Sequence, residues 1–279
     1  MSESTLSAFT ASDGENLAIQ NWPLPHGMPV RGIVVLVHGL GEHAGRYDHV
    51  AEFLNAQGFA VRGYDHYGHG ESAGARGTLS HPTRLLDDLA DVVDGVRDRV
   101  GPAMPLILLG HSMGGGVAAQ FVARRMRPVQ GLVLSSPALD AGLGVFQKLL
   151  LAVLPRWLPN LQVNNGLNAK YLSHDPAVVQ AYLADRMVHK LISPRLGRAI
   201  LDAGQEALAA APTWSLPTLL LYAGDDRLVS AEGSRRFAQL APSVVNAHCF
   251  ERLYHEIFNE PQRDAVLEQL GQWLQRNFK

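Results

Sequence analysis

A serine stands in a glycine-rich turn between a short apolar run and a run of helix-forming residues. Leu106–Leu109 is followed at once by Gly110-His111-Ser112-Met113-Gly114. This pattern predicts a buried strand, a sharp turn and a helix, with the Ser112 hydroxyl exposed at the tip of the turn as a nucleophile. Gly110 and Gly114 have no side chains, so the strand and the helix can approach closely. The alternative is a glycine-rich turn that holds a phosphate at the helix N-terminus.

Short apolar runs alternate with helical patterns over most of the chain. Strands are predicted at 33–37, 59–64, 106–109, 132–134, 218–223 and 244–250, and helices at 46–57, 83–100 and 265–278. This alternation is typical of an α/β fold, in which helices cover both faces of a mostly parallel sheet. Ligands bind beyond the carboxyl ends of the strands in such sheets, which is where Ser112 is expected.

One segment, residues 140–212, interrupts the alternation. It contains no convincing strand and is rich in leucine, proline and helix-compatible stretches. The simplest interpretation is a helical cap, or lid, inserted between two strands of a core that is formed by residues 1–139 and 213–279.

The first part of this insertion, Val145–Leu154, is almost entirely apolar. A helix that is apolar all round is usually buried in a protein core. The alternative is a lid whose apolar side chains, Phe146 and Leu150 among them, contact an acyl chain. Such a lid would also make transient contact with a membrane or micelle surface.

The composition excludes several classes of protein. The chain has 279 residues, of which 47% are hydrophobic, and this suits one large globular domain with an insertion. Its net charge of −2 offers no basic field to a nucleic acid. The single cysteine, Cys249, excludes an internal disulfide and a cysteine-based metal cluster, and its apolar surroundings predict a buried, unreactive thiol. No metal or other cofactor is expected.

The start of the chain predicts neither secretion nor membrane insertion. Met1–Glu15 is polar and contains no apolar core of a signal peptide. The sequence also lacks an uncharged apolar stretch of transmembrane length. A cytoplasmic location is therefore the default expectation.

A serine nucleophile needs a base and an acid that orients the base. Two aspartates, Asp225 and Asp226, follow the predicted strand at 218–223, and either could instead start a turn. His255 lies in the loop after the last predicted strand, whereas His248 lies within that strand. These positions favour His255 as the base. Asp226 is preferred to Asp225 because the segment resembles the G-x-D-x-x-V pattern of a triad acid.

The anion hole is expected to use two backbone N–H groups. One belongs to Met113, the residue after the nucleophile, and the other comes from the loop after the strand at 33–37. That loop reads His38-Gly39-Leu40-Gly41, and Leu40 is the expected donor. His38 is expected to brace this loop by hydrogen bonds. The His111 side chain is expected to point away from the tip of the turn.

Several segments together resemble the monoacylglycerol lipases of the α/β-hydrolase superfamily. His38-Gly39-Leu40-Gly41-Glu42-His43 with Gly45-Arg46-Tyr47 is similar to their first loop, and Asp65–Ser72 is similar to their D-x-x-G-H-G-x-S loop. The turn at Ser112 and the segments around Asp226 and His255 match as well. The resemblance covers roughly residues 30–140 and 215–279 and is weak in the insertion. It implies an α/β-hydrolase fold and hydrolysis of a small lipid ester.

The resemblance also implies contacts with the substrate. Glu42 and Arg46 correspond to polar residues near the glycerol head group in the animal enzyme. Their alternative role is a solvated ion pair at helical spacing. The animal enzyme has a histidine three residues after the catalytic one, whereas this chain has Phe258 there. Phe258 is therefore a candidate substrate contact that differs from the animal pattern.

The leading hypothesis is a serine ester hydrolase that cleaves monoacylglycerols to glycerol and a fatty acid through an acyl-enzyme. A general carboxylesterase, a lysophospholipase and a peptidase are alternatives that use the same machinery. A remote alternative is a ligand-binding protein that keeps the fold without rapid turnover. The sequence leaves the oligomeric state and the chain-length preference open.

Overall fold

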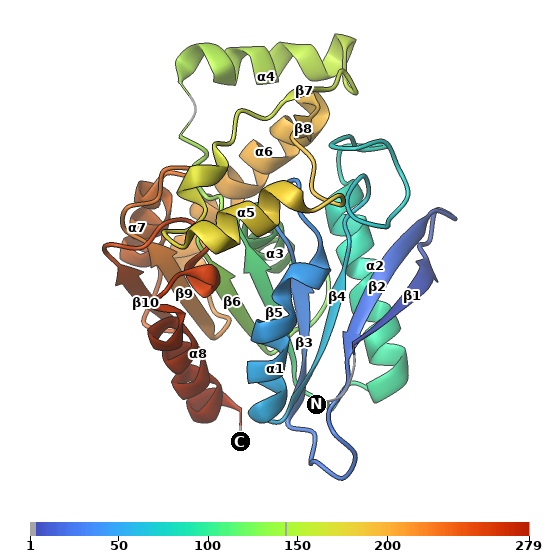
Figure 1. The fold of residues 1–279 in the computed structure, drawn as a ribbon, viewed down its shortest axis with the longest axis vertical. Helices are drawn as coiled ribbons and strands as arrows, with labels where there is room; N and C mark the ends of the chain where they lie inside the picture. The colour runs from blue at the N-terminus through green and yellow to red at the C-terminus, as the bar shows by residue number, and fades with distance from the viewer. Residues whose placement is uncertain (1–3, 143, 279) are drawn as a thin grey trace.

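The computed structural model describes residues 4–142 and 144–278 and is built around a sheet of eight strands (Figure 1). The strand order is β1-β2-β4-β3-β5-β6-β9-β10, and the strands from β4 to β10 run parallel to one another. The bounds are β1 Thr5–Thr10, β2 Asn16–Trp22, β3 Gly32–Val37, β4 Phe59–Tyr64, β5 Leu106–His111, β6 Gly131–Ser135, β9 Thr218–Ala223 and β10 Val245–Phe250. The predicted α/β-hydrolase fold class is confirmed.

Helices cover both faces of this sheet. They are α1 Asp48–Ala56, α2 Arg84–Val100, α3 Met113–Ala123, α4 Val145–Trp157, α5 Pro176–Ala184, α6 Pro194–Ala210, α7 Ala231–Leu240 and α8 Arg263–Asn277. Helices α1 and α8 share one hydrophobic cluster with one face of the sheet, and α2, α3, α6 and α7 share the other. The central strands are buried on both sides, which explains why they read as continuous apolar runs in the sequence.

The first two strands were not expected from the sequence. Strands β1 and β2 form an antiparallel hairpin, and β2 joins the sheet by antiparallel pairing with β4. Strand β1 is at the edge and is mostly exposed, so it carries no apolar run to mark it. Its backbone pairing with β2 holds it in place instead.

The insertion lies beyond the carboxyl ends of the parallel strands, and α4 is its part farthest from the sheet (Figure 1). Two-residue strands, β7 Val163–Asn164 and β8 Leu191–Ile192, pair with each other there, although no strand was expected. Helix α6 packs on α3, and its Leu196 and Ala207 belong to the main core cluster. The division into core 1–139 with 213–279 and cap 140–212 stays a prediction, since α6 joins the two parts continuously.

Two further expectations concern the burial of Cys249 and the presence of a membrane-spanning helix. Cys249 is half-buried rather than buried, because β10 is an edge strand. Over the part of the chain that the structure describes, no helix has both the length and the hydropathy needed to cross a bilayer.

Candidate active site

The turn between β5 and α3 has the strained geometry of a nucleophile elbow. Ser112 has φ of 53° and ψ of −121°, a conformation that non-glycine residues rarely adopt. A Cβ atom at Gly114 would collide with the carbonyl oxygen of Val37, and one at Gly110 would lie 2.5 Å from the carbonyl oxygen of Gly114. Only glycine fits these two positions, so the sequence itself enforces the close approach of strand and helix that exposes the Ser112 hydroxyl.

The structure brings together the three residues that the sequence analysis placed in a triad. His255 Nε2 lies 2.8 Å from Ser112 Oγ, and His255 Nδ1 lies 2.7 Å from Asp226 Oδ2. His255 is 4% exposed, so the chain of hydrogen bonds is shielded from water. The three side chains follow the carboxyl ends of β5, β9 and β10, and in a parallel sheet these ends lie on the same side. This is the geometry that nucleophilic catalysis by a serine requires.

The electrostatics of the pair suit a base that becomes positively charged during the reaction. Burial alone would lower the pKa of His255, but the charge and hydrogen bond of Asp226 outweigh it, with smaller contributions from Glu256 and Glu42, and the pKa is raised. Burial alone would raise the pKa of Asp226, but His255 and two backbone N–H groups hold it below its usual value. The imidazolium is therefore stabilised and Asp226 remains ionised.

The two candidate aspartates have different surroundings. Asp226 directs Oδ2 at His255, and its Oδ1 accepts hydrogen bonds from the N–H groups of Leu228 and Val229 at 2.9 and 3.0 Å. Asp225 instead pairs with Arg227 at the surface. Asp226 therefore both shapes the turn and faces His255.

The competing histidines lie away from Ser112 Oγ. His248 is an exposed strand side chain on β10. His111 is buried, its Nδ1 lies 3.1 Å from Ser135 Oγ, and its ring lies 4.8 Å from that of His255. Burial lowers the pKa of His111 to about 4, so it is a neutral neighbour of the base.

The loop after β3 packs directly against the elbow. Leu40 and Met113 line the same pocket as Ser112, as expected for the two residues that were predicted to supply the anion hole. His38 Nδ1 lies 2.7 Å from the carbonyl oxygen of Gly39, and its Nε2 accepts a hydrogen bond from the N–H of His66 at 2.9 Å. Burial lowers the pKa of His38 to about 3, so it braces the loop as a neutral side chain.

The pocket that contains Ser112 and His255 has a volume of about 330 Å³ and apolar walls. Leu150, Leu151 and Leu154 of α4 form part of the wall, so the candidate contact Leu150 lines the pocket that contains Ser112. The side chain of Phe146 lies outside the described residues. Apart from His255, the described residues of the wall carry no titratable side chain.

Three candidate substrate contacts lie elsewhere. Phe258 is 3% exposed and packs in the core cluster beneath the sheet, because the short helix Ile257–Asn259 turns it inward. Glu42 and Arg46 form their ion pair, but the pair is buried rather than solvated, and neither residue lines the Ser112 pocket. Substrate contact at these three positions has no support from the structure.

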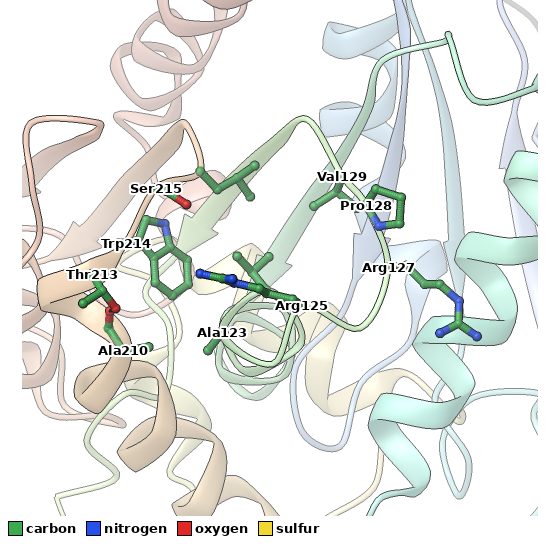
Figure 2. A pocket seen from close by; sticks show the side chains of 11 residues that line it. Ala123, Arg125, Arg127, Pro128, Val129, Ala210, Thr213, Trp214 and Ser215 are labelled. Carbon is green, nitrogen blue, oxygen red and sulfur yellow. The ribbon is translucent and has the colours of Figure 1, made fainter.

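A second hollow, of about 390 Å³, lies at the amino ends of β6 and β9, whereas Ser112 lies at the carboxyl ends of the strands. Figure 2 shows Arg125 pointing toward the ring of Trp214 there, with Arg127 directed away from Trp214. Its walls include arginines and a tryptophan but none of the triad residues. This hollow is separate from the chemistry described above.

Sequence reasoning missed Glu256, which accepts two hydrogen bonds from Arg46. The two residues are 210 positions apart, so no local pattern links them. The adjacency of Glu256 to His255 was the one available signal.

Comparison with known proteins gives a consistent family. Residues 28–262 match the family described as serine aminopeptidase, S33. A monoacylglycerol lipase of Mycolicibacterium smegmatis is 39% identical over 271 residues, which cover 96% of this chain and 95% of that protein. A phospholipase of Bacillus subtilis is 32% identical over 252 residues, 88% of this chain and 96% of that protein.

A solved structure agrees with these sequence matches. The crystal structure of a Paleococcus ferrophilus monoacylglycerol lipase superposes with a TM-score of 0.82 at 34% identity, covering 99% of this chain and 100% of that one. The similarity therefore spans the insertion as well as the sheet.

Proposed function

The chain belongs to the family described as serine aminopeptidase, S33, and because a close match within its relatives is named monoacylglycerol lipase, we propose that it hydrolyses monoacylglycerols to glycerol and a fatty acid. The observation that carries the proposal is the pocket of about 330 Å³, in which Ser112 and His255 open onto apolar walls. A single acyl chain is the part of a monoacylglycerol that such walls bind, because burying each methylene group in them contributes about 0.8 kcal/mol. The relatives named monoacylglycerol lipase support the same substrate.

We assign Ser112 as the nucleophile, His255 as the general base and Asp226 as the residue that orients His255. His255 removes the Ser112 proton as Oγ attacks the ester carbonyl, and the N–H groups of Leu40 and Met113 stabilise the oxyanion. His255 then gives its proton to the departing glycerol oxygen, which leaves an acyl-enzyme. Water, deprotonated by His255, attacks the acyl carbonyl and releases the fatty acid.

The cap provides the acyl-binding wall in this proposal. Leu150, Leu151 and Leu154 face the pocket, whereas Leu149 and Trp157 of the same helix are 60% and 75% exposed. Large apolar side chains exposed together are typical of a surface that contacts lipid. We therefore propose that α4 binds the acyl chain on one side and touches a membrane or micelle surface with the other.

The wall also bears on the alternatives. An aminopeptidase must bind a positively charged amino group, and a lysophospholipase must accommodate a charged head group. The described residues of the wall provide no carboxylate for either. A general carboxylesterase uses the same triad and differs only in chain-length preference. The hydrogen-bonded Ser112, His255 and Asp226 argue against a protein that merely binds its ligand.

A panel of substrates tests the proposal. Purified protein is compared on mono-, di- and triacylglycerols, lysophospholipids, short aryl esters and an aminoacyl anilide. The proposal predicts the highest kcat/KM for a long-chain monoacylglycerol. A higher kcat/KM for lysophospholipid, acetate ester or anilide than for monoacylglycerol would contradict it.

A further inference from the structure

A buried group of three charged side chains lies close to His255. It consists of Glu42, Arg46 and Glu256, and we call it the ion triad to distinguish it from the candidate catalytic triad. Arg46 Nη1 donates to Glu42 Oε2 at 2.6 Å and to Glu256 Oε1 at 2.7 Å, and its Nη2 donates to Glu256 Oε2 at 2.8 Å. The side chain of Arg46 is 11% exposed, and those of Glu42 and Glu256 are 4% and 5% exposed. The ring of Tyr182, from α5 of the insertion, covers the guanidinium at 4.9 Å.

One end of the ion triad holds the loop that supplies an anion-hole donor. Glu42 Oε1 accepts hydrogen bonds from the N–H of Gly39 at 2.6 Å and from the Tyr47 hydroxyl at 2.7 Å. Gly39 directly precedes Leu40. A Cβ atom at residue 39 would lie 2.8 Å from Glu42 Oε1 and 3.2 Å from the Cβ of Ser112. The Glu42 carboxylate therefore fixes the loop at the point where it touches the nucleophile.

The other end holds the loop that carries the base. Glu256 follows His255 directly, and both of its carboxylate oxygens accept from Arg46. The N–H of Glu256 donates to the carbonyl oxygen of Leu172 at 2.8 Å, and the side chain of Asn259 donates to Glu256 Oε2 at the same distance. The residue next to the base is thus held on three sides, and Arg46 is its link to the loop after β3.

We propose that Arg46 is a positioning residue for this hydrolase, because its bidentate bond to Glu256 and its bond to Glu42 set the distance between the His255 loop and the anion-hole loop. The inference rests on the proposed serine hydrolase mechanism and deepens it. In this inference Glu42 and Arg46 hold the two loops in position, and they do not contact the head group of the substrate. A lysine can take this role only in part, since an ammonium group keeps the charge but lacks the planar fork that binds two carboxylates.

A buried ion triad is a poor means of stabilising a fold. Removing the charges from water is costly for each ion, and well-packed apolar residues of similar size often give equal stability. What the ion triad supplies is a fixed distance between the segments that it connects. Here it joins Glu42 and Arg46, which lie between β3 and α1, to Glu256, which directly follows the base.

The charges of the ion triad also affect the pKa of His255. His255 is surrounded by Asp226 at Nδ1, by the neutral ring of His111, and by the carboxylates of Glu256 and Glu42, with Arg46 between the last two. Both of these carboxylates raise the pKa of His255. Removing the Arg46 charge should therefore raise that pKa further, whereas removing the Glu256 charge should lower it.

The test uses Arg46→Lys, Arg46→Met and Glu256→Gln, with Arg84→Lys as the matched control. Arg84 forms a buried i to i+4 pair with Asp88, with 1% and 2% exposure, on helix α2. A short aryl ester is the substrate, since it needs the serine machinery but not recognition of glycerol. Steady-state kinetics, the pH profile of kcat/KM and the thermal midpoint are measured for each variant.

We expect kcat to fall about 100-fold for Arg46→Met, the loss that a misplacement of about 1 Å causes, with KM changed less than about threefold. Arg46→Lys should lose about tenfold with its pH profile unmoved, because the charge remains but the fork is lost. The acidic limb of the profile should move to higher pH in Arg46→Met and to lower pH in Glu256→Gln. Arg84→Lys should lower the thermal midpoint while kcat and the pH profile stay unchanged.

Three results would overturn the proposal. A rise in KM for a monoacylglycerol, with kcat and KM for the aryl ester unchanged, would return Arg46 to a substrate contact. A loss of kcat in Arg84→Lys equal to that in Arg46→Lys, at equal thermal midpoints, would show a general effect of stability. Acidic limbs that do not move in opposite directions in Arg46→Met and Glu256→Gln would remove the electrostatic link. If wild type cleaves the aryl ester but not monoacylglycerols, the proposed substrate fails and this inference still stands.

Discussion

Replacing Asp226 by asparagine should disable the base while leaving its position intact. Oδ1 of Asp226 accepts the N–H groups of Leu228 and Val229, and Oδ2 faces His255 Nδ1 at 2.7 Å. The introduced asparagine would keep its amide oxygen on the two N–H groups, because they are donors. Its NH₂ group would then face His255 and force Nδ1 to become an acceptor. The imidazole proton would move to Nε2, where it points at Ser112 and blocks proton removal.

The expected magnitude follows from this change of tautomer. The corresponding substitution in a serine protease lowers kcat by about 10⁴, or about 5 kcal/mol of transition-state stabilisation. We expect a loss of the same order for Asp226→Asn, because the two hydrogen bonds that fix the orientation of its oxygen are present here. The control is Asp225→Asn, which removes only an exposed pair with Arg227 and should change kcat less than about threefold.

The assay is burst kinetics on an aryl ester, supported by the thermal midpoint of each variant. A burst that persists in Asp226→Asn with kcat above about a tenth of the wild-type value would refute the tautomer argument. Equal losses in Asp225→Asn and Asp226→Asn, with both proteins folded, would refute the choice of acid.

Three other predictions address stability, the cap and the elbow. Burial lowers the pKa of His38 to about 3 and of His111 to about 4, so the unfolded chain binds protons that the folded chain cannot. Stability is then full above about pH 6.5 and is lost as the pH falls, by about 2 kcal/mol per histidine at pH 5 in urea unfolding; equal unfolding free energies at pH 7 and pH 5 would contradict this. Leu150→Gln should depress hydrolysis of long-chain monoacylglycerols more than of acetate esters, and an unchanged chain-length profile would speak against an acyl-binding wall. Gly114→Ala should destabilise the fold by about 1–3 kcal/mol or more, since its Cβ collides with the carbonyl oxygen of Val37; an unchanged thermal midpoint would show that the elbow is not strained in this way.

The parts of the fold that were predicted correctly are those with a local signature. Strands β3 to β6 and β9 are buried on both faces, so each reads as an apolar run between loops. The candidate triad follows from the same signature, because Ser112, Asp226 and His255 each stand just beyond a strand and parallel strands bring those ends together. A local pattern in three places was thus enough to indicate one site.

The parts that were missed depend on distant partners. The exposed strand β1 is held by backbone pairing with β2 and has no apolar face to reveal it. Phe258 was placed by analogy in the substrate site, but the short helix after His255 turns it into the core. The bond between Arg46 and Glu256 spans 210 residues. Spacing in the sequence carries no information about such a pair.

The central claim is that Ser112 is the nucleophile of a serine ester hydrolase. Its most direct test is to treat the protein with a fluorophosphonate and locate the modified residue by mass spectrometry of peptides. The structure predicts one adduct on Ser112, formed more slowly when a saturating concentration of a monoacylglycerol is present during labelling, and absent from Ser112→Ala. An adduct on another residue, or full labelling of Ser112→Ala, would contradict the claim.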